Sequence, residues 1–179
     1  PGYDTLRFVL AKKVILVEGP TDEMILERCY LDDKGHLPLV DGIDIIVVDS
    51  LAFKRYCDIA VLLSKKTVII TDNDGDIQKN IQEKYADYLN KDYLVFIYEK
   101  DEDLNTIEPS VLAVNCINSE PTESFKAAIS KNNSMINKSY SEIKLFMENN
   151  KTEWAFRVFD STTKIVYPRY IHDAIKQFD

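Results

Sequence analysis

Two acidic clusters each follow a short run of apolar residues. The run 14–17 leads into Glu18 and, one helical turn later, Asp22; the run 67–71 leads into Asp72 and Asp74. If the two runs are neighbouring parallel strands, their carboxyl ends meet at one edge of the sheet, where open α/β sheets bind ligands. We therefore expect the four carboxylates to converge at that edge.

Carboxylates that converge raise one another's pKa and repel unless a cation lies between them. Hard oxygen ligands of this kind select Mg²⁺ or Mn²⁺, which keep several waters and take phosphate oxygens as further ligands. Such a centre positions a nucleophile and neutralises the charge that grows on phosphorus. The pattern predicts metal-dependent chemistry on phosphate esters.

Two other interpretations of these acids stay open. Asp and Gly after a strand are ordinary turn formers, and the helix dipole favours an acid such as Asp22 in a first turn. Counted from Asp72, Glu83 falls twelfth, where the calcium loop of an EF-hand requires a bidentate glutamate. Against calcium, Ile77 stands where that loop needs glycine, and a strand precedes the motif in place of a helix.

The elements that must position the acids follow from the apolar pattern. Short β-branched runs predict strands buried on both faces, at residues 14–17, 43–48, 67–71 and 93–98. Helical patterns occupy residues 22–31, 51–64 and 76–89, and Thr21 is placed to cap the first of them. The alternation predicts an α/β fold, a four-stranded parallel sheet flanked by helices.

The second half of the chain has a different texture. An acidic loop over 99–105 precedes a predicted short helix over 110–115, and residues 122–178 read as mostly helical around a polar loop at 130–139. We predict an α/β core over 1–105 and a helical extension over 106–179, within a single structural domain. A chain of 179 residues, 45% of them hydrophobic, is long enough for one core.

Composition limits the other classes of protein. The three cysteines are widely spaced, without a CxxC pair, and only two histidines accompany them, so neither a disulfide framework nor a zinc site is suggested. No apolar run is long enough to span a membrane and no signal peptide is visible, which predicts a cytoplasmic protein. The chain begins at Pro1 without an initiator Met, and we expect a fragment of a larger protein.

The net charge of −8 is unusual for a protein that binds nucleic acid, because phosphate contacts call for a basic surface. The acidic excess lies in residues 1–125, whereas residues 126–179 are net basic. An acidic half that gathers cations beside a basic half that follows a phosphate backbone suits metal-dependent chemistry. A plain acidic surface explains the same charges.

The pattern of an apolar strand, Glu18-Gly-x-x-Asp22 and a later strand ending in Asp72-x-Asp74 resembles the Toprim domain shared by topoisomerases, primases and several nucleases. Residues 6–22, LRFVLAKKVILVEGPTD, resemble more narrowly the Toprim domain of the overcoming lysogenization defect (OLD) family, ATPase-linked nucleases that include the Gabija anti-phage nuclease. The resemblance implies a Rossmann-like Toprim fold with a C-terminal helical extension. It also implies a Mg²⁺- or Mn²⁺-dependent endonuclease that nicks or cleaves DNA in anti-phage defence.

Carried onto this sequence, the resemblance assigns roles to individual residues. The implied metal ligands are Glu18, Asp22, Asp72, Asp74 and Glu108. Glu18 is also the implied general base, Glu108 the ligand of a second ion, and Lys151 a cation that stabilises transition-state charge. Ordinary roles stay open for the last two, because Glu108 precedes Pro109 at a helix start and Lys151 suits a solvated first turn.

Several residues are peripheral candidates. Asp76 follows Gly75, whereas topoisomerases commonly have the order DxDxDG, so this order disfavours strand passage and suits a helix cap. Arg169 is a candidate phosphate contact. Aromatic residues of the second half fit a base-stacking platform, but their helical spacing favours a core: Trp154, Phe156, Phe159, Tyr167 and Tyr170.

The resemblance also implies partners, namely DNA, an N-terminal ATPase domain in the parent chain and a homo-oligomer formed through the parent protein, with no membrane. No GKS/T loop occurs, so this segment is not expected to bind ATP. Two other functions stay open. One is a catalytically quiet Toprim module for assembly or sensing, and the other is primase- or topoisomerase-like chemistry, which the lack of zinc-binding cysteines disfavours.

Overall fold

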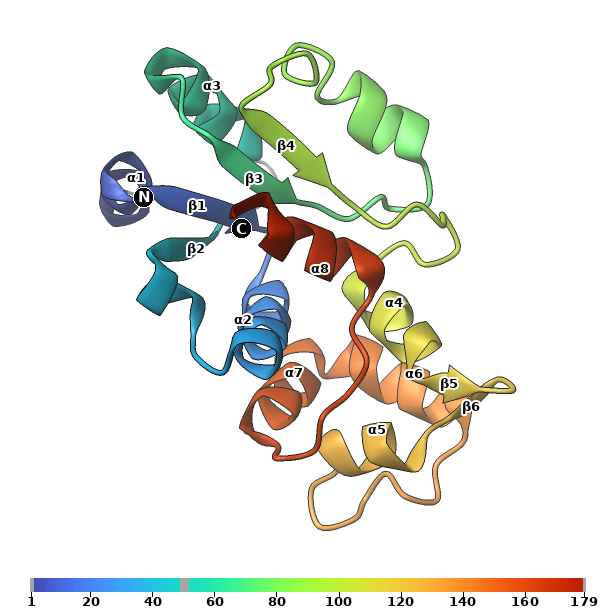
Figure 1. Ribbon diagram of the computed structural model, residues 1–179. Coiled ribbons are helices and arrows are strands. Elements are labelled where there is room, and N and C mark those ends of the chain that lie inside the picture. The colour runs from blue at the N-terminus through green and yellow to red at the C-terminus, as the bar shows by residue number, and fades with distance from the viewer. Residues whose placement is uncertain (1, 49–51, 179) are drawn as a thin grey trace.

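A parallel sheet holds the acidic segments in place. The computed structural model describes residues 2–48 and 52–178. The sheet has the strand order β2-β1-β3-β4 (Figure 1). Its strands are β1 (Lys13–Val17), β2 (Ile43–Val47), β3 (Thr67–Ile70) and β4 (Leu94–Ile97). The predicted four-stranded parallel α/β fold is confirmed.

The pairing of β1 explains where the acids lie. In the register of the sheet, Leu16 of β1 stands between Ile46 of β2 and Ile69 of β3. All residues of β3 are buried, as are all but the first of β1, which is why both strands are continuous apolar runs. Because β1 and β3 are parallel neighbours, the segments that follow them leave the sheet at the same edge.

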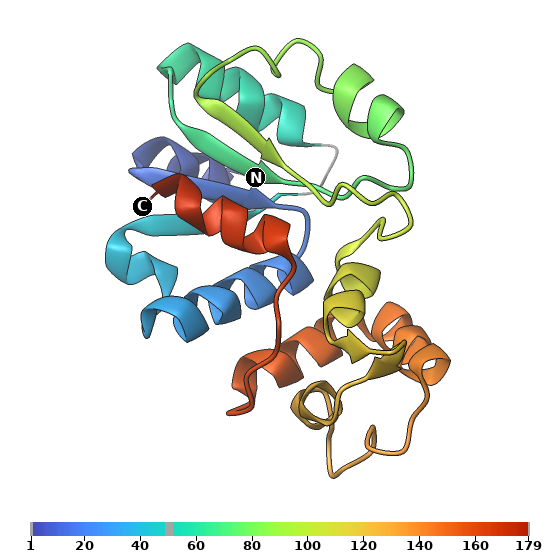
Figure 2. The ribbon, with the colours of Figure 1, turned by 45° about the vertical axis from the view of Figure 1, so that its right-hand side comes forward.

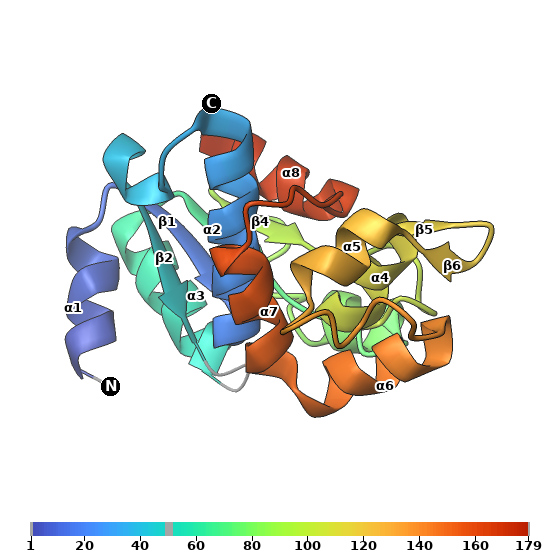
Figure 3. The ribbon, with the colours of Figure 1, turned by 90° about the horizontal axis from the view of Figure 1, so that it is seen from below.

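Helices cover both faces of the sheet (Figures 1 and 3). On one face lie α1 (Gly2–Leu10) and α3 (Phe53–Leu63), whose side chains Phe8 and Phe53 pack in one core. On the other face lie α2 (Pro20–Lys34) and α8 (Arg169–Ile175), which share the larger core with Ile15 and Val68. Each layer buries the apolar stripe of its helices against the sheet.

One predicted helix start differs from the structure, and another lies outside the described residues. The first turn of α2 begins at Pro20, preceded by Gly19 with extended backbone angles. Thr21 is therefore buried inside the first turn, and its prediction as the cap is wrong. Proline at the first helical position needs no hydrogen-bond partner, which moves the start before Thr21. The helix predicted over 51–64 starts at Leu51, which lies outside the described residues, and α3 begins at Phe53.

The segment predicted as a regular helix over 76–89 forms a shorter helix with a wider turn. Only η3 (Gln78–Glu83) is helical, with a π-type turn in which the Lys84 N–H donates to the Lys79 carbonyl at 3.1 Å, and turns follow to residue 90. Ile81 and Tyr85 are fully buried. One wide turn thus buries both side chains without a long helix.

After β4 the chain forms mostly helices, as predicted. They are α4 (Ile107–Val114), α5 (Glu123–Ala128), α6 (Tyr140–Asn149) and α7 (Lys151–Asp160), with a small hairpin of β5 (Cys116–Ile117) and β6 (Glu120–Pro121). The short segments η1 (Pro38–Asp41) and η4 (Lys176–Phe178) complete the chain. Figures 1 and 2 show α4–α7 grouped beyond the carboxyl ends of the strands, while α8 returns to the sheet.

The start of α4 lies earlier than the predicted helix at 110–115. Thr106 precedes the helix with extended backbone angles, so Glu108 and Pro109 fall in the first turn, where proline is tolerated. This places Glu108 on a helix that faces the sheet edge.

The helices after residue 106 share a core with the sheet layer. Trp154 and Ile171 pack in the same buried cluster as Ile25 of α2. Arg28 of α2 adds a polar link, since its guanidinium donates to the Phe159 carbonyl at 2.8 Å near the end of α7. Within the described residues, no helix combines the length and the apolar character needed to cross a membrane.

Candidate metal centre

Glu18 and Asp72 are joined directly at the tips of β1 and β3. Two donors bind Glu18 Oε1: the Thr71 hydroxyl at 2.6 Å and the backbone N–H of Asp72 at 3.0 Å. The end of β3 therefore holds the Glu18 carboxylate, which follows the neighbouring strand β1. The segments that follow β1 and β3 thus meet at this edge of the sheet.

Asp22 lies in the first turn of α2, close to the same point. Its Oδ2 accepts the backbone N–H of Gly19 at 3.0 Å, which holds the turn between β1 and α2. Burial, followed by the charges of Glu18 and Glu108, raises the pKa of Asp22 to about 7. Asp22 thus occupies the ordinary position of an early-helix acid and also lies near Glu18 and Glu108.

Asp72 is the most perturbed acid of the centre. Burial raises its pKa to about 9, and the nearby charges of Asp22, Glu18, Glu108 and Asp74 add to the effect in that order. Each of these carboxylates thus lies near enough to disfavour ionised Asp72. All five acids predicted as metal ligands belong to one electrostatic cluster.

Asp74 and Asp76 sit in the turn that follows β3. Asp74 and Gly75 both adopt left-handed backbone angles, with φ of 50° and 75°, and the Asp74 N–H donates to the Asn105 carbonyl at 3.2 Å. Asp76 is exposed, and its Oδ1 accepts the Lys79 N–H at 2.9 Å. Asp76 therefore acts as a cap of the η3 turn.

Glu108 brings α4 to the centre. Its side chain is only 2% exposed, and one oxygen, Oε2, accepts the Thr106 hydroxyl at 2.8 Å. Buried Oε1 accepts no hydrogen bond and lies 3.7 Å from the Lys151 ammonium at the start of α7. A buried carboxylate oxygen without a donor is costly unless a cation satisfies it.

The residues present fit a hard divalent cation. The donors are carboxylate oxygens from β1, α2, the end of β3 and α4; the raised pKa values of Asp22 and Asp72 show that negative charge is in excess there. Oxygen-rich sites with this charge suit Mg²⁺ or Mn²⁺. These carboxylates are therefore the candidate ligands of a divalent cation.

Some predicted residues lie away from this cluster. Arg169 opens α8 with a side chain 93% exposed, and it lines a groove of about 470 Å³ together with Tyr98 and Lys100. Of the aromatic residues, Trp154, Tyr167 and Tyr170 are buried and Phe156 is exposed. The interpretation of this set as core holds for the buried members.

The calcium-loop interpretation does not fit this geometry. Glu83 is exposed on the η3 turn, where its Oε1 accepts the Gln78 amide at 3.3 Å. The acids that perturb Asp72 come instead from β1, α2, α4 and the adjacent turn.

Sequence reasoning missed the polar residues that support the centre. Asn73 is 1% exposed, and its amide donates to the carbonyls of Glu99 and Asp101 at 2.9 and 3.0 Å, which ties the β3 turn to the loop after β4. Tyr170 of α8 is buried close to Asp22 and Asp72, and burial raises its pKa. The sequence around Asn73 and Tyr170 predicts neither contact, because each contact joins segments that are far apart in the chain.

A parallel sheet ordered β2-β1-β3-β4, with acids at the tips of β1 and β3, defines a Toprim-type α/β domain. Residues 9–74 match the family model for the TOPRIM domain of overcoming lysogenization defect protein-like proteins. The OLD-like Toprim match covers residues 9–74, and the resemblance seen in the sequence is confirmed there.

Solved structures agree with that assignment. The C-terminal region of the OLD protein of Xanthomonas campestris pv. campestris, in its platinum-phased structure, gives a TM-score of 0.62 at 16% identity and covers 96% of this chain and 94% of that chain. Its mercury- and iodine-phased structures give TM-scores of 0.58 and 0.56 at 16% identity; each covers 94% of this chain, and 95% and 94% of their own chains. At this identity the likeness establishes a shared fold. No curated protein matched the sequence.

Proposed function

We propose that this chain is the nuclease module of an OLD-type protein, a Mg²⁺- or Mn²⁺-dependent endonuclease that nicks or cleaves DNA. The observation that carries the proposal is the joining of Glu18 to the Asp72 segment, with Asp22 and Glu108 close enough to raise the pKa of Asp72. A cluster this unfavourable without a cation is typical of a functional site.

The side chains divide the chemical work among them. A bound divalent cation would supply positive charge to the phosphate oxygens and lower the pKa of water. Glu18 is held through Oε1 by Thr71 and Asp72, and we assign its Oε2 to accept the proton of the attacking water. The Lys151 side chain is 58% exposed beside buried Glu108, from where its ammonium stabilises charge on the transferred phosphate.

The DNA would reach the centre along the groove at the start of α8. Arg169 and Lys100 line the groove at the start of α8, and Tyr170 of the same helix lies near Asp22 and Asp72. Arginine and lysine side chains bind phosphate regardless of base sequence. We assign this groove to the DNA backbone.

The wider setting of the proposal rests on the family resemblance. It comprises a parent chain with an N-terminal ATPase domain, a homo-oligomer formed through that parent, a cytoplasmic location and a role in anti-phage defence. Within the chain, we assign residues 1–105 to the Toprim core and 106–179 to its helical extension, in a single structural domain.

Conversion of supercoiled plasmid to nicked or linear forms tests the nuclease. We expect cutting with Mg²⁺ or Mn²⁺, none with EDTA, and loss of cutting in Glu18→Gln and Asp72→Asn. Glu120→Gln, an exposed acid of β6, is the matched control and should cut normally. Circular dichroism of each variant checks that the fold persists.

Two outcomes would contradict this proposal. Cutting that survives in both site variants would place the chemistry elsewhere. Failure of every protein to cut, also with the parent chain restored, would favour a quiet Toprim module that serves assembly or sensing.

A further inference from the structure

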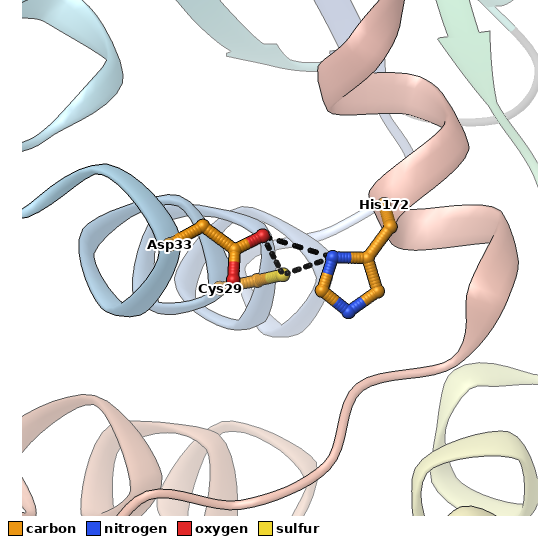
Figure 4. Close-up of side chains that lie close together, drawn as sticks. All are labelled: Cys29, Asp33 and His172. Carbon is orange, nitrogen blue, oxygen red and sulfur yellow. Dashed lines mark hydrogen bonds and ion pairs between the residues drawn. The ribbon is translucent and has the colours of Figure 1, made fainter.

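A second group of potential metal ligands lies where α2 meets α8 (Figure 4). His172 Nδ1 is 2.9 Å from Asp33 Oδ2 and 3.6 Å from Cys29 Sγ, and the sulfur is 4.0 Å from the same carboxylate oxygen. Among the described residues, this is the one group of three or more Cys, His, Asp or Glu side chains whose ligand atoms all lie within 4.8 Å of one another. The strand-tip acids are more widely spread.

The fold brings these three side chains together from distant parts of the chain. Cys29 and Asp33 are four residues apart on α2, so they share one face of the helix. His172 belongs to α8, and Figure 4 shows its ring directed at that face. The pair on α2 thus offers two ligands and α8 adds a third.

The geometry separates a metal site from a nucleophilic triad. In a triad the nucleophile and the carboxylate bind opposite nitrogens of the imidazole ring. Here the sulfur and the carboxylate both approach Nδ1. Three ligand atoms that converge on one point are the arrangement that a single cation requires.

The separations also suit a particular size of ion. Bonds of about 2.3 Å to sulfur and about 2.0–2.2 Å to nitrogen and oxygen, in a tetrahedron, place the ligand atoms roughly 3.4–3.6 Å apart. The separations in the structure, 2.9, 3.6 and 4.0 Å, lie on both sides of that spacing. Shifts of about half an ångström would complete the tetrahedral geometry.

We propose that Cys29, Asp33 and His172 bind a Zn²⁺ ion. A thiolate, an imidazole and a carboxylate form a ligand set that suits zinc and that Mg²⁺ avoids. The thiolate and the carboxylate together balance the two charges of the ion. This site is separate from the strand-tip centre, and its existence does not depend on the proposed nuclease.

Burial of the site gives the ion access from one side. Cys29 is fully buried, whereas the side chains of Asp33 and His172 are 41% and 32% exposed. The ion can enter past the two exposed ligands, and water can take the fourth position.

Zinc binds cysteine as the thiolate, so binding at Cys29 is expected to release a proton.

Zinc at this position would join the two helices that flank the strand-tip centre. The helix α2 carries Asp22 in its first turn, and α8 carries Tyr170, which is buried near Asp22 and Asp72. The ion would fix the spacing of α2 and α8 without contacting the reacting groups. Its expected effect is on the thermal stability of the whole chain.

Co²⁺ titration of the chain after treatment with a chelator tests the site, because thiolate-bound tetrahedral Co²⁺ gives charge-transfer and visible bands. We expect one such Co²⁺ per chain, displaced by Zn²⁺. The bands should disappear in Cys29→Ser and His172→Gln. Cys116→Ser and His36→Gln, at a partly exposed cysteine and at the other histidine, are the matched controls and should keep the bands.

A substitute variant and a melting-temperature measurement complete the test of the zinc site. If Cys29→Ser does not fold, Asp33→Asn, at a partly exposed ligand, takes its place. Zn²⁺ should raise the melting temperature of the wild type and of Asp72→Asn, but not that of His172→Gln. Absence of a thiolate band in the wild type, or a band that persists in folded Cys29→Ser or Asp33→Asn, overturns the proposal. Plasmid cutting is scored separately, so either proposal can fail alone.

Discussion

Replacing Asp72 with asparagine should stabilise the protein when no divalent cation is present, and the gain should grow with pH. Burial and four neighbouring acids raise the pKa of Asp72 from 3.8 to about 9. Asparagine resembles the protonated acid in shape but carries no titratable charge. In the metal-free wild type, folding requires Asp72 to take up a proton at any pH at which the unfolded chain has released it, and this lowers the free energy of unfolding. The asparagine variant does not pay this cost.

The sign and size of the effect follow from proton linkage. Between the ordinary pKa and about 9, the unfolded chain releases the Asp72 proton while the folded chain keeps it. Each rise of one pH unit then lowers the free energy of unfolding by about 1.4 kcal/mol. From about pH 5 to about pH 7 the loss is roughly 3 kcal/mol, a large part of the ~5–15 kcal/mol that stabilises a typical domain.

Urea unfolding in EDTA at several pH values in this window measures the effect. The difference in free energy of unfolding between Asp72→Asn and wild type should widen by about 3 kcal/mol across it. Asp103→Asn, at an exposed acid of the loop after β4, should follow the wild type. Excess Mg²⁺ should narrow the difference, because a cation favours ionised Asp72. Parallel pH dependences for wild type and Asp72→Asn in EDTA would refute the reasoning.

Three further predictions concern other parts of the chain. Trp154→Ala should lower the free energy of unfolding by about 3–5 kcal/mol because the side chain is fully buried, whereas exposed Phe156→Ala should change it by less than about 0.5 kcal/mol, both by urea titration. Lys151→Ala should reduce plasmid cutting by about 100-fold while circular dichroism stays unchanged, and equal cutting would remove this lysine from the mechanism. Arg28→Met should lower the free energy of unfolding by about 3–5 kcal/mol in the same titration, because it removes the cation beside the Asp32 carboxylate, whose side chain is only 9% exposed and which then keeps the Tyr167 hydroxyl as a donor.

The sheet was predictable because its signal is local. Each strand is a continuous apolar run, and burial on both faces produces that run directly, as the fully buried strand β3 shows. The wide turn of η3 was not predictable, because the spacing of Ile81 and Tyr85 fits a regular helix and a wide turn equally well. The sequence also placed two helix starts too late: α2 begins at Pro20, and α4 begins directly after Thr106.

The acids at the strand tips were predictable for a related reason. A parallel sheet brings the ends of neighbouring strands together, so the convergence of Glu18 and Asp72 follows once β1 and β3 are neighbours. Glu108 and Lys151 needed the family resemblance, because α4 and α7 reach the centre from the helical extension. The support from Asn73 and Tyr170 depends on loop and helix contacts that no local pattern encodes.

The cysteine spacing carried no signal of the cluster formed by Cys29, Asp33 and His172. A zinc site was not suggested because no two cysteines or histidines are close in the sequence, yet Cys29, Asp33 and His172 meet in the fold. Spacing rules detect sites built on one turn or hairpin, whereas this group needs a helix from each end of the chain. Only the return of α8 to the sheet, after all the helices of the extension, brings His172 to α2.

The helix α2 is therefore the element that links the two halves of the molecule. Its first turn carries Asp22 to the strand tips, and its middle carries Arg28, which binds the end of α7. Its last turns carry Cys29 and Asp33 to α8. A cluster of mutually repelling acids needs a rigid frame, because each carboxylate would otherwise move apart from the others. Contacts along the whole length of α2, to β1, α7 and α8, supply that frame.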